Sequence, residues 1–200
     1  MSNFNSLTAS ELGYMIGQCQ IDPVELTEHF LSQIELSPIG TKIYSTVTSK
    51  LALEQAKDSK KRADLGRRLS SLDGVPISWK DLFDISGYPC EAGSELLAGR
   101  LAIKNSKVYN FAEAHGLICL GKTHMSELAF SGLGLNPVRE TPPCVNYPES
   151  VPGGSSSGAA TSVAFGLAAA GIGSDTGGSV RIPAAWNDLI GFKTTSGKIS

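Results

Sequence analysis

Small hydroxyl residues stand between glycines at two places where the surrounding sequence is apolar. Residues 151–160 read VPGGSSSGAA, and residues 173–184 read GSDTGGSVRIPA. Only three charged residues occur within 151–190, namely Asp175, Arg181 and Asp188. This composition predicts that the second stretch is buried despite its polarity, at the least as a glycine turn. A serine there can also act as a nucleophile once a base removes its proton, with glycines letting backbone N–H groups surround an anion.

A lysine is the best candidate for that base. Lys80 ends the apolar run Val75–Trp79. A lysine at a strand end usually extends into solvent, but loss of water lowers the pKa of the ammonium, so that the neutral amine can accept a proton near pH 7. Of the three histidines, His29 and His115 stand in sequences typical of a protein surface. His124, in GKTHMSE, is a candidate for substrate contact.

Length and composition fit one globular domain or part of a larger one. The 200 residues are 41% apolar and 18% charged, with a formal net charge of −2. The sequence has no cluster of positive charge, so we expect no contact with nucleic acid or an anionic membrane. The four cysteines form no CxxC pair and lie near no histidine at ligand spacing, so we expect no metal. The absence of a signal sequence or long apolar run predicts a cytoplasmic protein.

Strands alternate with helices after an N-terminal helical region, which indicates an α/β fold. A capping box at Thr8–Glu11 predicts the first helix, Asp22 with Pro23 predicts the second, and the charged residues 49–66 predict a third. Pro76 argues for an edge or irregular position of the strand that ends at Lys80. The remaining elements expected are a helix at 106–115, a strand at 117–120, a short helix near 125–130, a loop at 132–150, a helix at 157–165, a strand at 167–172 and an apolar piece at 189–193.

Four stretches together resemble the amidase signature family of serine hydrolases. They are GVPISWKD, GKTHMSE, VPGGSSSGAA and GSDTGGSVRIPA, in a match that is collinear from about Leu7 to the last residue. The resemblance implies a mixed β-sheet core covered by helices. Residues 1–200 would form the N-terminal half of one such domain, with a helical layer at 1–70 and the catalytic core at 71–200. Members of the family are usually more than twice this length, so we expect a domain truncated on its C-terminal side.

The resemblance also implies a Ser–Ser–Lys triad without a cofactor or metal. Ser179 would be the nucleophile, Ser155 the bridging serine after a cis peptide bond, and Lys80 the general base. Backbone N–H groups would form the oxyanion hole, contributed by Thr176, Gly177, Gly178 and Ser179. Support for the substrate or the loop would come from His124, Asp175 and Arg181, with Arg181 expected to brace the loop.

Three functions fit these residues. The first is an amidase that hydrolyses the C–N bond of a small-molecule carboxamide and allows a homodimer. The second is the A subunit of a glutamine-dependent tRNA amidotransferase, in which the residue after the matching arginine is usually Gln. Here that residue is Ile182, which favours the amidase. The third is a truncated, catalytically silent fragment or an anion-binding module.

Overall fold

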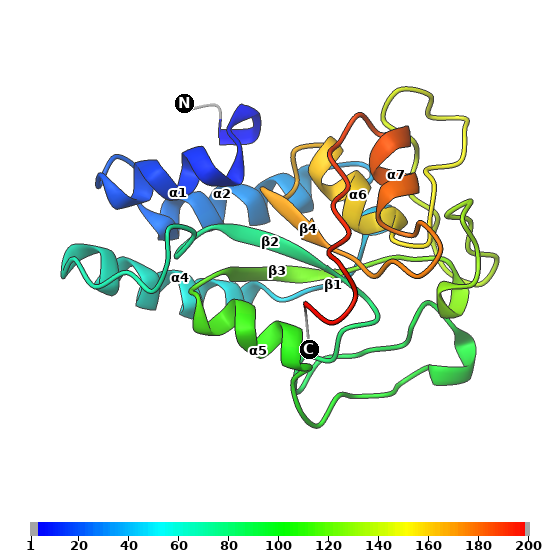
Figure 1. The fold of residues 1–200 in the computed structure, drawn as a ribbon, viewed down its shortest axis with the longest axis horizontal. Helices are drawn as coiled ribbons and strands as arrows, with labels where there is room; N and C mark the ends of the chain where they lie inside the picture. The colour runs from blue at the N-terminus through cyan, green and yellow to red at the C-terminus, as the bar shows by residue number, and fades with distance from the viewer. Residues whose placement is uncertain (1–3, 199–200) are drawn as a thin grey trace.

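A four-stranded mixed β-sheet runs through the middle of the protein, with helices packed against it (Figure 1). The computed structural model describes residues 4–198. The strands are β1 (Tyr44–Val47), β2 (Pro76–Lys80), β3 (Ile118–Thr123) and β4 (Ala170–Ile172), in the order β1-β3-β2-β4. β2 is parallel to β3 and β4, whereas β1 is antiparallel to β3. The α/β fold with a mixed sheet is therefore confirmed.

The predicted N-terminal helices are confirmed as α1 (Ala9–Gly17), α2 (Pro23–Leu36) and α4 (Ser49–Asp64). Thr8 and Glu11 form the capping box of α1, and the Asp22 side chain caps α2. The apolar faces of α1 and α2 enter the core through Leu12 and Phe30. Within the same region the structure adds η1 (Phe4–Ser6), the short helix α3 (Gly40–Ile43) and strand β1, which the sequence analysis missed.

An edge or irregular position was expected for β2. The edge position is wrong, because this strand lies between β3 and β4, but its pairing with β3 is irregular, since the register shifts between Ile77 and Ser78. Pro76 is the first residue of the strand, where its missing N–H costs little. Its carbonyl still accepts a hydrogen bond from Ala169 N at 3.1 Å. Along β2, Trp79 packs against Tyr109, with ring centroids 5.1 Å apart. Since side chains alternate along a strand, Lys80 points to the opposite face.

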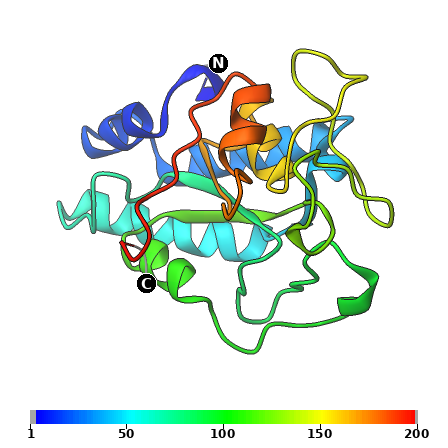
Figure 2. The same cartoon turned by 45° about the vertical axis from the view of Figure 1, so that its right-hand side comes forward.

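The second half follows the predicted order with shifted bounds. The helices and strands here are α5 (Lys107–Ala114), β3, η3 (Glu127–Ala129), α6 (Ser157–Ala164) and β4, and η2 (Glu95–Leu97) precedes them. Residues 132–150 form the predicted long loop, drawn in yellow-green beside α6 (Figure 2). The helix α7 (Arg181–Trp186) was not predicted, because Pro183 argues against a helix here. Proline is nevertheless tolerated in a first helical turn. The apolar piece at 189–193 forms no helix or strand, and its Ile190 is exposed.

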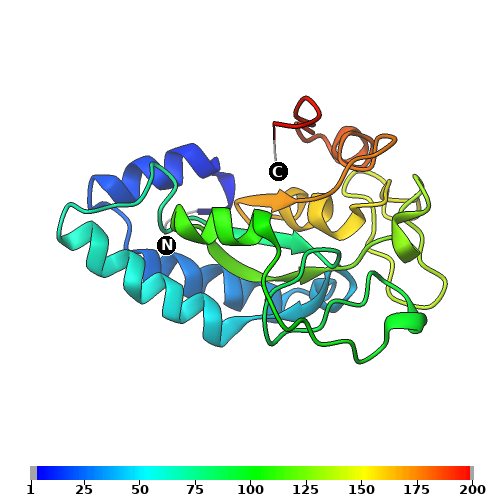
Figure 3. The same cartoon turned by 60° about the horizontal axis from the view of Figure 1, so that its bottom comes forward.

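The last described residues run from α7 past β4 (Figure 1, Figure 3). α6 packs on β2, β3 and β4. Its first turn comes close to neighbouring backbone, because Gly158 N donates to His124 O at 2.9 Å. Among the described residues, no helix is both long enough and apolar enough to cross a bilayer.

We predict that Gly158→Ala destabilises the protein by about 1–3 kcal/mol, because an added Cβ overpacks the site. That Cβ would lie 2.7 Å from the carbonyl oxygens of both His124 and Ile43. The measurement is the thermal unfolding midpoint of the protein expressed from its complete reading frame. Gly132→Ala is the control, because its Cβ would meet only the Ile182 side chain, at 3.5 Å. Equal midpoints for the two variants would contradict the close approach of α6.

Candidate active site

Lys80 lies at the centre of the candidate site, at the end of the central strand β2. Its side chain is fully buried. Its Nζ is hydrogen-bonded to two hydroxyls, Ser155 Oγ at 2.6 Å and Ser174 Oγ at 2.8 Å. Burial lowers the pKa of the Lys80 ammonium to about 7, while the negative charge of Asp175 partly opposes that shift. An amine with this pKa is substantially neutral at physiological pH and can accept a proton.

Ser155 is held by backbone contacts on both sides. The Gly154–Ser155 peptide bond is cis. Ser155 O accepts from Ser126 N at 3.1 Å, and Gly154 N donates to Gly132 O at 2.8 Å. A Cβ on Gly154 would lie 2.6 Å from Gly134 N, so only glycine fits before this serine. These contacts fix the Ser155 hydroxyl beside the Lys80 amine, two residues before α6 begins.

A main-chain hydrogen bond links Ser179 to the segment that carries Ser155. Ser156 N donates to Ser179 O at 3.1 Å, which joins the loop before α7 to the segment that carries Ser155. Ser179 is half-buried. Within residues 4–198, no hydrogen bond involves the Ser179 hydroxyl. The structure thus joins the side chains of Lys80 and Ser155 directly and brings Ser179 next to them by its backbone.

Asp175 organises the loop that bears Ser179. Its carboxylate accepts the backbone N–H groups of Gly178 and Val180 at 2.8 and 3.1 Å. It also accepts Arg181 Nε at 3.0 Å and Nη2 at 2.9 Å. The Arg181 guanidinium, followed by these backbone donors, holds the pKa of Asp175 well below its usual range. The carboxylate and the guanidinium together close the loop on itself, which is the geometry that a bracing role for both residues requires.

One of the four predicted oxyanion donors already has a partner within the protein. The Gly178 N–H is occupied by Asp175. The N–H groups of Thr176, Gly177 and Ser179 have no protein partner among the described residues, and Thr176 and Gly177 are exposed. The predicted burial of residues 173–184 is therefore wrong for much of the stretch. Within this stretch Gly178, Pro183 and Ala184 are buried, Thr176, Gly177 and Arg181 are exposed, and the other residues are partly buried.

His124 lies close to the site, but its observed contacts there are made by its backbone and support α6. It is 8% exposed, and burial lowers the pKa of its imidazole. Its carbonyl accepts from Gly158 N at 2.9 Å and from Ser157 Oγ at 3.4 Å. No hydrogen bond between residues 4 and 198 joins its ring to Lys80, Ser155 or Ser179. The backbone of His124 thus supports the start of α6.

Sequence reasoning missed a buried ion pair next to the candidate base. Lys122 Nζ donates to Asp81 Oδ1 at 2.8 Å and to Pro89 O at 3.1 Å. The side chains of Lys122 and Asp81 are 0% and 6% exposed. Asp81 is also tied through its N–H to Thr123 O at 3.1 Å. The sequence feature that could have indicated this pair is the presence of two charged residues in or next to apolar strands. The pairing of Asp81 with Lys122 fixes the chain directly after Lys80.

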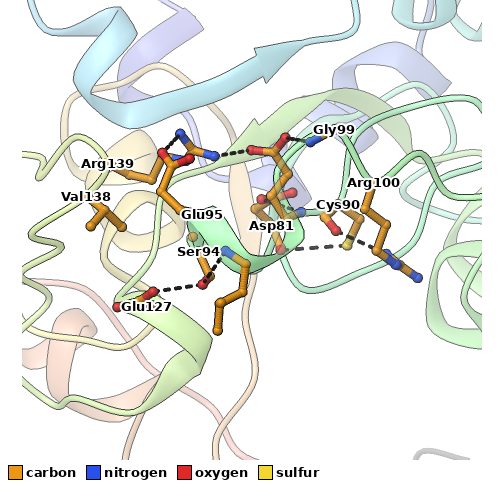
Figure 4. A network of polar contacts seen from close by, with 12 residues as sticks. Asp81, Cys90, Ser94, Glu95, Gly99, Arg100, Glu127, Val138 and Arg139 are labelled. Atoms are coloured by element: carbon orange, nitrogen blue, oxygen red, sulfur yellow. Dashed lines mark hydrogen bonds and ion pairs between the residues drawn. The ribbon is translucent and has the colours of Figure 1, made fainter.

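The same network clamps the loop after β2 to the long loop at 132–150 (Figure 4). Asp81 Oδ2 accepts the N–H of Glu91 at 3.0 Å. The Glu91 carboxylate in turn pairs with Arg139 at 2.8 Å, and Arg139 also pairs with Glu95. Ser94 Oγ donates to Glu127 at 2.7 Å. These contacts join the loop after β2 to Glu127 of η3 and to Arg139 of the long loop.

Metal chemistry has no visible ligand set in residues 4–198. No group of three or more His, Cys, Asp or Glu side chains there is arranged to hold an ion. The four cysteines are free thiols, three of them buried.

Comparison with known proteins gives one consistent group. The family model described as Amidase matches residues 25–200. The glutamyl-tRNA(Gln) amidotransferase A subunit from Acinetobacter baylyi is 37% identical over the whole chain, and that from Anaeromyxobacter dehalogenans is 38% identical over 95% of it. The chain spans 40% and 39% of these relatives.

Solved structures agree with the sequence comparison. A bacterial aryl acylamidase of the amidase signature family superposes with a TM-score of 0.84 at 29% identity, over 94% of this chain and 39% of its own. The peptide amidase from Stenotrophomonas maltophilia gives a TM-score of 0.85 at 26% identity, over 92% of this chain and 39% of its own.

We predict that Lys122→Met lowers the free energy of unfolding by about 3–5 kcal/mol, because it leaves the Asp81 carboxylate buried without a cation. Chemical denaturation of the protein from its complete reading frame measures the loss. The double variant Asp81→Asn with Lys122→Met should recover most of the stability, since the introduced amide oxygen can still accept the Glu91 N–H. A double variant as unstable as the single one would show that the pair acts by packing alone.

Proposed function

The chain belongs to the amidase signature family, and from this premise we propose that the protein cleaves the C–N bond of a carboxamide through a serine acyl-enzyme. The observation that carries the proposal is the fully buried Lys80 amine, hydrogen-bonded to Ser155 Oγ at 2.6 Å. Its pKa of about 7 suits a general base. The proposal applies to the protein as expressed from its complete reading frame.

In the proposed mechanism, Ser179 Oγ attacks the amide carbonyl carbon. Ser155 takes the Ser179 proton as it passes its own proton to neutral Lys80. The carbonyl oxygen becomes an oxyanion, for which the N–H groups of Thr176, Gly177 and Ser179, unpartnered among the described residues, are the available donors. Preorganised donors of this kind are each worth about 3–4 kcal/mol in other hydrolases.

Collapse of the tetrahedral intermediate breaks the C–N bond. The proton on Lys80 returns through Ser155 to the leaving amine, which departs as a neutral molecule. Water then attacks the Ser179 ester, and the same relay accepts and returns its proton. The cycle regenerates Ser179 and releases a carboxylic acid, without a cofactor.

The side chain after Arg181 favours a stand-alone amidase. Ile182 lies in the first turn of α7, and its Cδ1 is 2.7 Å from where a Cβ on Gly178 would be. An apolar side chain at this place offers no hydrogen bond to a second amide or amino group of the substrate. We therefore propose small-molecule carboxamides without such a group as substrates, in a cytoplasmic enzyme whose free thiols suit a reducing compartment.

The amidotransferase alternative rests on a separate observation. The curated relatives compared above are named as the A subunit of glutamyl-tRNA(Gln) amidotransferase. On that alternative the same triad would release ammonia from glutamine, and the protein would bind partner chains. A homodimer belongs to the amidase proposal, and size-exclusion chromatography with light scattering separates the two assemblies.

We predict that Ser179→Ala and Lys80→Met each lower kcat for amide hydrolysis by at least about a thousandfold. The double variant should be little worse than either, because residues of one proton relay fail together. Methionine replaces the length of Lys80 without its charge, so the fold should persist. Steady-state hydrolysis of an aryl acylamide, with circular dichroism of each variant, is the measurement. Substantial activity in folded Ser179→Ala would sink the proposed function.

The pH profile provides a second test. Only the neutral amine of Lys80 accepts a proton, and its ammonium has a pKa of about 7. Accordingly, kcat/KM should rise through about pH 7 and fall about tenfold per unit well below it. A profile flat from pH 5 to pH 8, with chemistry rate-limiting, would exclude Lys80 as the base.

We also predict that the protein hydrolyses simple acyl amides faster than glutamine, as judged by kcat/KM on a panel of both. Ile182→Gln should shift this ratio toward glutamine, because the new side chain can hydrogen-bond the polar substrate. Ile182→Leu, which keeps an apolar side chain, is the matched control. Preference of the unaltered protein for glutamine would favour the amidotransferase alternative.

A further inference from the structure

We propose that Ser174 is a positioning residue that orients the Lys80 amine so that its lone pair faces Ser155. This inference rests on the proposed function. Ser174 Oγ lies 2.8 Å from Lys80 Nζ, and Ser155 Oγ lies 2.6 Å from the same nitrogen. The Lys80 amine is thus placed between two hydroxyls that could compete for it.

The count of donors and acceptors separates the two serines. A neutral amine has two N–H bonds and one lone pair, whereas a hydroxyl has one O–H bond and two lone pairs. To act as base, Lys80 must direct its lone pair at the Ser155 O–H. Its N–H bonds must then find acceptors elsewhere, and Ser174 Oγ is the hydroxyl within reach. Without this acceptor, the amine is free to rotate and to donate to Ser155 instead.

Ser174 is itself held in place. Ser156 Oγ donates to Ser174 O at 3.3 Å, and Ser156 N donates to Ser179 O at 3.1 Å. Asp175, the next residue, is bound by Gly178 N and Arg181. The acceptor for Lys80 and the proposed nucleophile therefore sit on one braced loop, so their positions relative to Lys80 are set together.

Proton transfer increases the importance of Ser174. Protonated Lys80 has three N–H bonds and still donates to Ser174, so this contact stabilises the ammonium. The charged groups around Lys80 are already engaged. Asp175 pairs with Arg181, and Asp81 pairs with Lys122. His124, which follows β3, is buried, and a lowered pKa keeps its imidazole neutral near pH 7.

Two roles of Ser174 thus predict opposite shifts in the pH profile. Loss of the acceptor alone destabilises the ammonium, so the acidic limb of kcat/KM should move to lower pH. Loss of a merely structural contact would loosen the loop and admit water to Lys80. Renewed hydration raises the pKa of a buried lysine toward its usual value, and the limb would then move to higher pH.

The experiment compares Ser174→Ala, Ser174→Thr and the unaltered protein, each expressed from its complete reading frame. For Ser174→Ala we expect kcat about tenfold lower, KM within about twofold, and the acidic limb about half to one pH unit lower. Ser174→Thr keeps the hydroxyl and should retain the original limb and most of kcat. Ser150→Ala, an exposed serine on the long loop, should change neither value. A limb that stays in place or moves upward in folded Ser174→Ala would overturn the proposal.

A second readout does not depend on turnover. In protein labelled with ¹³C at the lysine ε-carbons, Lys80→Met identifies the Lys80 signal, and its titration midpoint should be lower in Ser174→Ala than in the unaltered protein. An equal or higher midpoint overturns the role of Ser174. Failure of the proposed function would give a different result: Ser179→Ala would still hydrolyse the amide, while the titration midpoint of Lys80 would still change in Ser174→Ala.

Discussion

An amine that has lost its water and gained only neutral hydroxyl partners is the constraint around which this protein is arranged. Lys80 is fully buried, and its two hydrogen bonds go to serines. Desolvation then favours the uncharged amine, which is the form that can remove a proton. Three separate parts of the chain must meet to exclude water there: the end of β2, the start of α6 and the loop after β4. The close approaches at Gly154 and Gly158 follow from this requirement, because any side chain would push these parts away from the amine.

Lys122 shows what the same side chain does in the same sheet when a carboxylate is supplied. It is as buried as Lys80, but it pairs with Asp81 at 2.8 Å. Such a pair is a structural tie, because separating its charges within the protein is costly. The two lysines lie on neighbouring strands, and Asp81 follows Lys80 directly. The protein thus directs its nearest carboxylate to the anchoring lysine and, among the described residues, leaves the other lysine without a counter-ion in hydrogen-bond contact.

Local signals made the helices and the site segments predictable, whereas contacts between distant residues did not. Thr8 and Asp22 marked helix starts correctly because capping involves only adjacent residues. Lys80 and Ser155 could be paired only through the family resemblance, since 75 residues separate them. Pro76 misled because its local preference does not say which strands flank it. Ser174 was missed because the Asp175 and Ser179 that follow it carry clearer chemical signals, and the exposure of Thr176 depends on which elements cover the loop.

The alternation of side chains along β2 has a consequence for how this segment can vary. Ser78 and Lys80 face α6, where they meet Ser162 and Ser155, while Trp79 between them faces α5. Inserting or deleting one residue inside Pro76–Lys80 would reverse the faces beyond that point. An indole or a carboxylate would then stand where the amine is required. Substitutions within the strand preserve this alternation, whereas an insertion or deletion of one residue reverses it and removes the amine from the site.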